Sequence, residues 1–178
     1  MSRAFADPEL EQRRLAALAV VRQLGDPVLR TPASAVTEFD AALQDEIARM
    51  ERIMVDAHGV GLAAPQVGAL RRLLVYRVAD GAPTRALVNP RLVWVSDEED
   101  TDAEGCLSIG EISVDVTRPV AIRVEAQDAD GQPVVVEAEE FEARVIQHEM
   151  DHLDGVLILD RTSKEQRREA LRALRAAT

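Results

Sequence analysis

The sequence contains little cysteine and no long apolar segment, and both absences exclude classes of protein. Cys106 is the single cysteine among 178 residues, so no intramolecular disulfide can form, which fits a reducing compartment. The apolar run LAALAVV (residues 15–21) is too short to span a bilayer. Asp7, Glu9 and Glu11 precede it, whereas a signal peptide would be basic there and a transit peptide poor in acids. We therefore expect a cytoplasmic protein.

Basic charge is also scarce. The chain has 21 Lys and Arg residues against 32 Asp and Glu residues, which gives a net charge of −11 at pH 7. Phosphate binding depends on clustered Lys and Arg, so this balance argues against direct binding of nucleic acid. The acidic run SDEEDTDAE, from Ser96 to Glu104, is interpreted as a solvated loop. The length and the 47% of apolar residues fit one globular domain with a substantial core.

The first third of the chain predicts one clear helix. Residues 8–22 fit either a short amphipathic helix or a loose arm, and residues 23–33 (QLGDPVLRTPA) read as an extended, irregular segment. Residues 39–57 carry apolar side chains at steps of three and four, and Asp40 stands where a helix cap is expected. We therefore predict a capped amphipathic helix over 39–57.

The rest of the chain predicts strands followed by helices, which indicates an α+β fold. An Asp-Gly pair in residues 128–132 predicts a hairpin turn between the last two β-rich runs. Helical spacing returns over residues 141–154, with Gly155 as the cap, and a charged amphipathic helix is expected from residue 164 onward. The β-rich runs are residues 72–78, 85–95, 120–128 and 133–140.

Two of only three histidines lie four residues apart in QHEMDHLDG, residues 147–155. On a helix, His148 and His152 would share one face and could bind one metal ion, with Glu149 able to approach a water on that ion. A chance match on a helix surface is the alternative. The periodicity favours the metal site, because an adjoining stripe of the same helix is apolar and suited to burial. That stripe comprises Ile146, Met150 and Leu153.

A catalytic zinc-type site needs a third protein ligand and one open position. In metzincin peptidases the H-E-x-x-H pattern continues to a third histidine, but Ile158 stands at that position here. A lone cysteine is by itself more simply a small buried hydrophobe. The residues alone therefore leave the third ligand open among four candidates: His58, Cys106, Glu165 and Glu169.

Three segments together resemble the signature motifs of the peptide deformylase family, in the family's order and at similar spacing. They are HGVGLAAPQVG (residues 58–68), EGCLS (residues 104–108) and QHEMDHLDG (residues 147–155). Residues 23–33 also resemble the segment near the family's start, so the resemblance extends from about Val21 to Arg161. It implies an N-terminal extension over residues 1–20 and a single catalytic domain over 21–178. The implied fold has small antiparallel or mixed sheets packed around a central HExxH-bearing helix, with an N-terminal and a C-terminal helix.

The resemblance implies an enzyme that hydrolyses the N-formyl group from the initiator methionine of nascent polypeptides at the ribosome, releasing formate. Glu149 would be the acid/base, and the Gln66 side-chain amide and the Leu107 N–H would stabilise the oxyanion. One divalent ion would be bound, Fe²⁺ by preference, with Zn²⁺, Ni²⁺ or Co²⁺ as alternatives. Its three ligands would be Cys106, His148 and His152.

The substrate-binding residues are expected around the first motif. Gly59 and Gly61 lack a Cβ, so the backbone can approach a ligand closely, and a substrate peptide could pair with it as an added strand. On the glycines alone, a plain turn is the alternative. Val60 and Val145 are predicted to line an apolar pocket for an unbranched side chain. His58 is interpreted as a loop residue and not as a metal ligand.

Two further expectations concern structure, and two departures from the family pattern concern the substrate. Glu104 and Arg118 are predicted to form an ion pair that holds the EGCLS segment, as they would in the family. Trp94 and Tyr76 are interpreted as core aromatics. The family usually has proline where Gly110 stands, and many bacterial members carry a basic residue soon after it, which residues 111–116 lack. These departures leave substrate affinity and preference open.

Other functions compete with deformylation. One is a related metal-dependent amidohydrolase that acts on another N-acyl substrate. A second is an inactive deformylase-like protein that only binds nascent chains, which the intact set of motif residues argues against. A third is a zinc peptidase, which the absent third histidine and the soft cysteine ligand make weaker.

Overall fold

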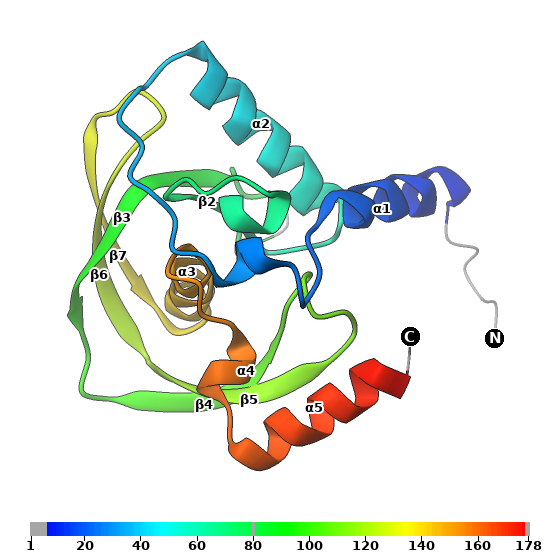
Figure 1. Ribbon diagram of the computed structural model, residues 1–178. Helices are drawn as coiled ribbons and strands as arrows, with labels where there is room; N and C mark the ends of the chain where they lie inside the picture. The colour runs from blue at the N-terminus through cyan, green and yellow to red at the C-terminus, as the bar shows by residue number, and fades with distance from the viewer. Residues whose placement is uncertain (1–6, 80, 177–178) are drawn as a thin grey trace.

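The computed structural model describes residues 7–79 and 81–176, and it shows an α+β fold built from two antiparallel sheets and helices around them (Figure 1). The larger sheet has five strands, in the order β1 (Gly61–Ala63), β2 (Leu73–Tyr76), β3 (Arg85–Val95), β6 (Ala121–Gln127) and β7 (Pro133–Glu139). The smaller sheet pairs β4 (Glu99–Gly105) with β5 (Ser113–Pro119). The helices are α1 (Pro8–Val20), α2 (Ala41–Asp56), α3 (Glu140–Leu153), α4 (Ile158–Arg161) and α5 (Lys164–Ala176), with 3-10 turns η1 (Pro27–Arg30) and η2 (Ala64–Val67).

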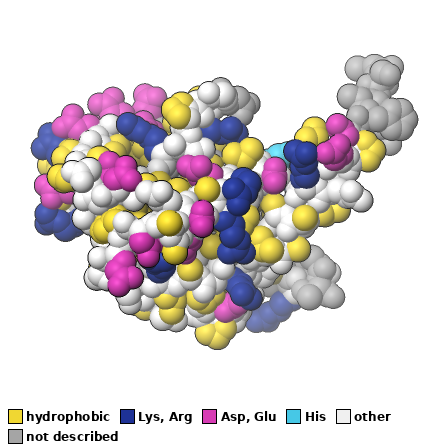
Figure 2. All heavy atoms as spheres, turned by 90° about the horizontal axis from the view of Figure 1, so that it is seen from above, with side chains coloured by type: hydrophobic (Ala, Val, Ile, Leu, Met, Phe, Trp, Pro, Cys, Tyr) yellow, Lys and Arg dark blue, Asp and Glu magenta, His cyan; other side chains and the backbone are white. Residues whose placement is uncertain are grey.

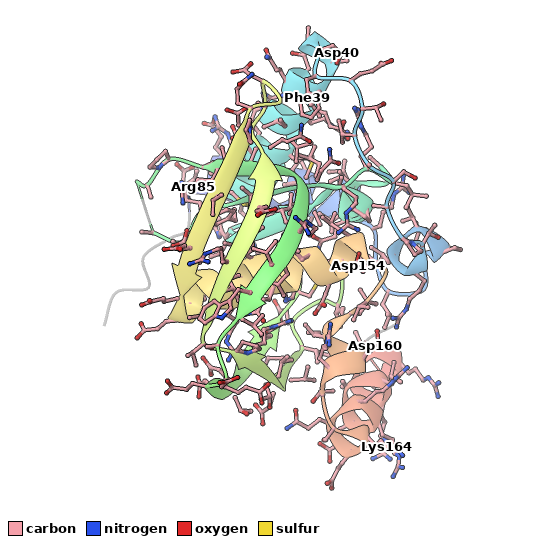
Figure 3. The ribbon with its side chains drawn as sticks, turned by 90° about the vertical axis from the view of Figure 1, so that its left-hand side faces the viewer. Phe39, Asp40, Arg85, Asp154, Asp160 and Lys164 are labelled. Carbon is pink, nitrogen blue, oxygen red and sulfur yellow. The ribbon has the colours of Figure 1, made fainter. Side chains whose placement is uncertain are left out.

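Helix α3 occupies the centre of the molecule. It packs against strands of both sheets, and Figure 3 shows β3, β6 and β7 crossing in front of it. The apolar stripe predicted from periodicity is buried, since Ile146 and Leu153 are fully covered and Met150 almost so. Gly155 follows the helix at φ 73°, and its N–H donates to the His152 carbonyl. The prediction of a central HExxH helix that ends before Gly155 is confirmed.

Helix α2 forms as the spacing predicts. The Asp40 carboxylate accepts a hydrogen bond of 2.9 Å from the Leu43 N–H, which satisfies a backbone donor that the first turn leaves open. Its buried side chains recur at steps of three and four and cover the core: Leu43, Ile47, Met50, Ile53 and Met54. The capped helix predicted within residues 39–57 is confirmed over 41–56, and in the undecided segment 8–22 residues 8–20 form the helix α1.

The predicted hairpin joins β6 to β7. The Asp128 carboxylate accepts hydrogen bonds of 2.9 Å from the N–H groups of Asp130 and Gln132, and Gly131 takes φ 79°. A side chain at Gly131 would also meet the Phe39 ring, at 3.0 Å from its Cγ. In Figure 3 the labelled Phe39 lies beside the tip of this hairpin.

The interpretation of residues 96–104 as a loop holds for residues 96–98 and is wrong for residues 99–104. Residues 99–105 form β4, whose backbone pairs with β5 along its whole length, and the Thr101 and Thr117 hydroxyls lie 2.8 Å apart across the pair. The acidic side chains of β4 are exposed, with the exception of Glu104. Cross-strand pairing therefore outweighs the low strand propensity of Asp and Glu.

The two aromatics differ in their environment. Tyr76 is 1% exposed, and its hydroxyl donates to the Glu142 carboxylate at 2.9 Å, so its interpretation as a core residue is confirmed. Trp94 is 50% exposed, so the same interpretation is wrong for it. Trp94 lies in the outer half of β3, whose last five side chains are all exposed. Within the described residues, no helix is long and apolar enough to cross a membrane.

Candidate metal centre and active site

Three potential ligands converge beside α3. Cys106, His148 and His152 each offer one ligand atom, and these atoms all lie within 4.8 Å of one another. The Cys106 Sγ is 3.3 Å from the His152 Nε2, and the two imidazole centroids are 5.0 Å apart. Thiolate sulfur with two imidazole nitrogens suits Zn²⁺, Fe²⁺, Ni²⁺ or Co²⁺. The donor set and its spacing fit one divalent ion.

The fold brings these residues together from two separate parts of the chain. The histidines face one way because they are one turn apart on α3. Cys106 follows β4 directly, and α3 packs against β5, the partner strand of β4. Among the described residues, the potential ligand group does not include the other three candidates, which are His58, Glu165 and Glu169. The exposed His58 follows α2 in a left-handed conformation (φ 58°), as expected of a loop residue.

Glu104 orients His148. Its Oε2 lies 2.9 Å from the His148 Nδ1, which leaves the Nε2 of that ring on the side of Cys106. Burial would raise the pKa of Glu104, but hydrogen bonds and charge from Arg118 and His148 outweigh it and lower the pKa to about 2. Glu104 is therefore a carboxylate near neutral pH and accepts a hydrogen bond from the imidazole.

Arg118 anchors this carboxylate in the interior. Its guanidinium makes two hydrogen bonds to Glu104, at 2.6 and 2.9 Å, so the predicted ion pair is confirmed. Arg118 also donates to Asp151 at 2.9 Å, and Arg144 donates to Glu104 at the same distance. No sequence pattern indicated that Asp151 or Arg144 belongs to this network. Together they satisfy charges that would be costly to bury alone.

Glu149 on α3 lies directly against Gly61 of β1. Its side chain is buried, and its Oε2 and the His152 Nδ1 have no hydrogen-bond partner within the described residues. Burial raises the pKa of Glu149 to about 7, while the neighbouring His148 charge acts in the opposite direction. A carboxyl group with a pKa near 7 can both accept and release a proton at neutral pH.

Gln66 presents its amide to the same site. Its Oε1 accepts a hydrogen bond of 2.9 Å from the Ala63 N–H, which fixes the orientation of the side chain. The Nε2 then points to the Ser108 hydroxyl at 3.2 Å and to the Cys106 sulfur at 3.6 Å. The donor atoms of Gln66 therefore face the potential ligand group, in the direction that its expected role requires.

The segment after α1 ties two loops of the site together. The Arg22 N–H donates to the Gln66 carbonyl at 2.7 Å, and the Gln23 side-chain amide donates to the Leu107 carbonyl at 3.1 Å. The Leu24 N–H donates to the Ser108 carbonyl at 2.8 Å. Sequence reasoning missed these tethers. Each tether accepts at a backbone carbonyl far away in the sequence, so no local sequence pattern marks it.

A cleft of about 420 Å³ opens over the site. Its lining includes all four residues expected to bind substrate: Gly59, Val60, Gly61 and Val145. Val145 is buried in the wall, whereas Val60 is 43% exposed at the mouth. Leu107 and Phe141 also line the cleft, as do Arg14 and Leu18 from α1. The volume lies in the range of sites that hold small molecules or short peptide segments.

A protein-family model described as polypeptide deformylase matches residues 18–168. The chain belongs to this family. A peptide deformylase of Acidothermus cellulolyticus is 47% identical over 161 residues, which cover 90% of this chain and 88% of the relative. The Thermotoga maritima peptide deformylase is 46% identical over 147 residues, which cover 83% of this chain and 88% of the relative.

Solved structures agree with this family assignment. The peptide deformylase of Synechococcus elongatus, solved in complex with actinonin, superposes with a TM-score of 0.83 at 41% identity, over 86% of this chain and 85% of that one. The Legionella pneumophila peptide deformylase gives 0.84 at 38% identity, over 88% of this chain and 92% of that one. The family and the α+β fold expected from the motifs are confirmed. The division at residue 20 and the individual residue roles stay predictions.

Gly61 permits the close approach of Glu149, which yields a test. A Cβ at position 61 would lie 2.8 Å from both Cγ and Cδ of Glu149 and would overlap its carboxylate. We expect Gly61→Ala to displace Glu149, the residue predicted to be the acid/base. A catalytic group misplaced by about 1 Å can cost 10²-fold, so kcat should fall by roughly tenfold or more. Steady-state kinetics with metal analysis measures this.

Gly59→Ala is the matched comparison for this variant. A Cβ there meets the flexible Leu107 Cδ1 at 3.0 Å, so we expect a smaller loss of kcat. Equal kcat for Gly61→Ala and the wild type would show that this close contact does not position Glu149.

Proposed function

We propose that this protein is a metal-dependent peptide deformylase, which hydrolyses the N-formyl group from the initiator methionine of new polypeptides and releases formate. The observation that carries the proposal is the buried group of Cys106, His148 and His152 beside Glu149, at a substrate-sized cleft. The chain's membership of the deformylase family supports the same reaction.

The metal site is assigned to three side chains, which are Cys106, His148 and His152. A divalent ion held there supplies Lewis-acid chemistry, which lowers the pKa of water and polarises a carbonyl group. We propose Fe²⁺ as the native ion because the resemblance to the deformylase family favours it; the thiolate and imidazoles suit Zn²⁺, Ni²⁺ or Co²⁺ equally, so these ions could replace it. Glu104 keeps the His148 Nδ1 protonated, so that its Nε2 is free to act as a ligand.

Glu149 moves the proton in this mechanism. Its carboxylate accepts a proton from the attacking water and passes it to the departing amine of the methionine, first as general base and then as general acid. The C–N bond of the formamide breaks, leaving formate and a free amino terminus. Its pKa of about 7 suits both transfers near neutral pH.

Gln66 and Leu107 stabilise the negative oxygen that develops on the formyl carbon. The Gln66 Nε2 and the backbone N–H of Leu107 are fixed donors, which lose little freedom when the oxyanion forms. Gly59, Val60 and Gly61 form the wall against which the peptide backbone lies as an added strand. We propose formylmethionyl nascent chains at the ribosome, in the cytoplasm, as the substrates.

An anaerobic assay of formate release tests the proposal. Formyl-Met-Ala-Ser and acetyl-Met-Ala-Ser are compared, with metal analysis of the same sample. Release of formate with little deacetylation supports deformylation. Faster turnover of the acetyl peptide would favour the related amidohydrolase. No turnover of either peptide by metal-loaded, folded protein would favour the inactive binding protein.

The apolar pocket beside Val145 is expected to favour substrates whose first side chain is apolar. Val60 and Val145 present apolar surface to the cleft. Burying a charge there without a partner costs several kcal/mol. We therefore expect kcat/KM to be at least about tenfold higher for formyl-Met and formyl-norleucine peptides than for formyl-Asp peptides. The measurement compares kcat/KM for three tripeptides that differ only at the first residue. Equal values for all three would contradict the apolar pocket.

A further inference from the structure

Helix α1 forms part of the wall of the substrate cleft. Arg14 and Leu18 line the same cavity as Gly59, Gly61 and Glu149. They are four residues apart, so they present one face of the helix to the cleft. Most of α1, including Arg14, precedes the region that the family model matches, which begins at residue 18. The cleft therefore has a wall that the shared motifs do not specify.

The C-terminal end of α1 is placed by packing, and hydrogen bonds just after the helix tie the chain to the site. Ala17 and Val21 are buried in the core cluster that includes α2, and Leu18 packs against that cluster. Immediately after the helix, the Arg22 N–H is bonded to the Gln66 carbonyl. Figure 2 shows α1 as an arm that leaves the body of the molecule, with histidine and Lys or Arg side chains together at its base. The Arg14 face is thus held beside the cleft.

Arg14 is available to bind a substrate. Its guanidinium lies 3.5 Å from Glu11 in a solvent-exposed ion pair, which contributes little and is easily exchanged. Arg144 also lines the cleft, but it donates to the Glu104 carboxylate and the Val116 carbonyl at 2.9 and 2.8 Å. Its charge is therefore already neutralised within the protein.

The rim of the cleft is otherwise acidic. The exposed carboxylates of Asp102 and Glu111 belong to its lining. Arg14 is therefore a positive group in a rim of negative ones, and it can bind a carboxylate that would be repelled elsewhere on the rim. Leu18 supplies apolar contact one helical turn away.

We infer that the Arg14–Leu18 face of α1 is a binding subsite for the residues that follow formyl-methionine, and that it favours an acidic side chain at the second or third position. The inference rests on the proposed deformylase function and names its preferred substrates. A peptide that enters along Gly59 to Gly61 extends by about 3.3 to 3.6 Å per residue, so residues after the first reach the mouth of the cleft.

The test uses amidated peptides, which carry no terminal carboxylate to occupy Arg14. Formyl-Met-Xaa-Ala-amide and formyl-Met-Ala-Xaa-amide are compared, with Asp, Ser or Lys as Xaa. In the wild type we expect roughly two- to fivefold lower KM for Asp than for Lys at one of the two positions, with similar kcat, as for a partly exposed ion pair. Raising the salt concentration should reduce this difference.

Arg14→Glu should reverse the order, so that the Lys peptide has the lower KM, while the metal content stays unchanged. Arg14→Lys should retain the Asp preference. The matched control is Arg13→Glu, which makes the same charge change one residue away, at an exposed side chain that pairs with Glu9. It should leave the ratio of KM values unaltered.

Two failures are distinguishable. If the wild type releases no formate from any peptide, the proposed function fails. If it releases formate, but Arg14→Glu shifts the ratio of KM values no more than Arg13→Glu, the subsite on α1 is overturned and the deformylase function stands.

Discussion

Glu149→Gln is expected to keep the metal and to lose nearly all turnover. The glutamine amide has almost the same shape as the carboxylate, but it cannot accept the proton of the attacking water. Removal of a positioned general base typically lowers kcat by roughly 10²- to 10⁴-fold. Because the loss concerns the reaction step, kcat should fall much more than KM rises. Single-turnover formate release, measured beside the metal content of the same preparation, checks both parts.

Glu142→Gln is the control for that variant. Glu142 lies on the same helix, where Tyr76 and Arg85 bind its carboxylate, and it is not part of the cleft lining. This change from carboxylate to amide should leave kcat close to the wild-type value. A Glu149→Gln enzyme that retained about a tenth of wild-type kcat would lie above the range for loss of a general base, and Glu149 would not be the acid/base.

Cys106→Ser is expected to release the metal. A serine hydroxyl stays protonated near pH 7 unless an ion forces its deprotonation, and it is a harder ligand than the thiolate. The affinity for the ion should fall by more than the roughly 10- to 100-fold that follows loss of a hydrogen bond to a metal ligand. Metal content after dialysis and formate release should both drop.

His58→Ala provides the contrast. His58 is the third histidine of the chain, but it is exposed and outside the potential ligand group. The variant should bind metal as the wild type does. Circular dichroism of both variants shows whether they fold, so that loss of metal is not confused with unfolding. If His58→Ala lost the ion while Cys106→Ser kept it, the proposed ligand set would be wrong.

Local sequence patterns predicted the helices and turns whose formation depends on residues close together in the chain. The helix over residues 41–56 follows from apolar spacing and the Asp40 cap, and the hairpin at residues 128–132 follows from its Asp-Gly turn. The strand β5 was missed, although SVDVTRP alternates between exposed and buried side chains. Its two valines are too few to signal a strand beside an aspartate and a buried arginine. The partner strand β4 is acidic and also lacks a strand pattern. Both strands are therefore recognised only from their pairing in the structure.

The residues of the site also fall into two groups, those that local sequence motifs predicted and those that they did not. His148, His152 and Glu149 stand in one short motif whose residue types and spacing carry the chemistry, so they were predictable. Cys106 was assigned only through the resemblance to the deformylase family. Asp151, Arg144 and the tether from Gln23 were not predictable. Gln23 and Leu107 are 84 positions apart in the chain, and their contact depends on how α1, η1 and the sheets assemble. No local sequence pattern encodes such a contact.

The tether after α1 connects the two proposed oxyanion donors, Gln66 and Leu107, through one short segment of chain. Residues 22–24 bond to the backbone of Gln66 on one side and to Leu107 and Ser108 on the other. Arg22 and Gln23 are exposed, and α1 before them buries a single residue, Ala17. Segments with so few buried contacts open more often than the core does. Local opening of α1 and residues 22–24 can therefore loosen both donors while the sheets stay folded. On heating or in denaturant, activity should be lost before the protein unfolds globally.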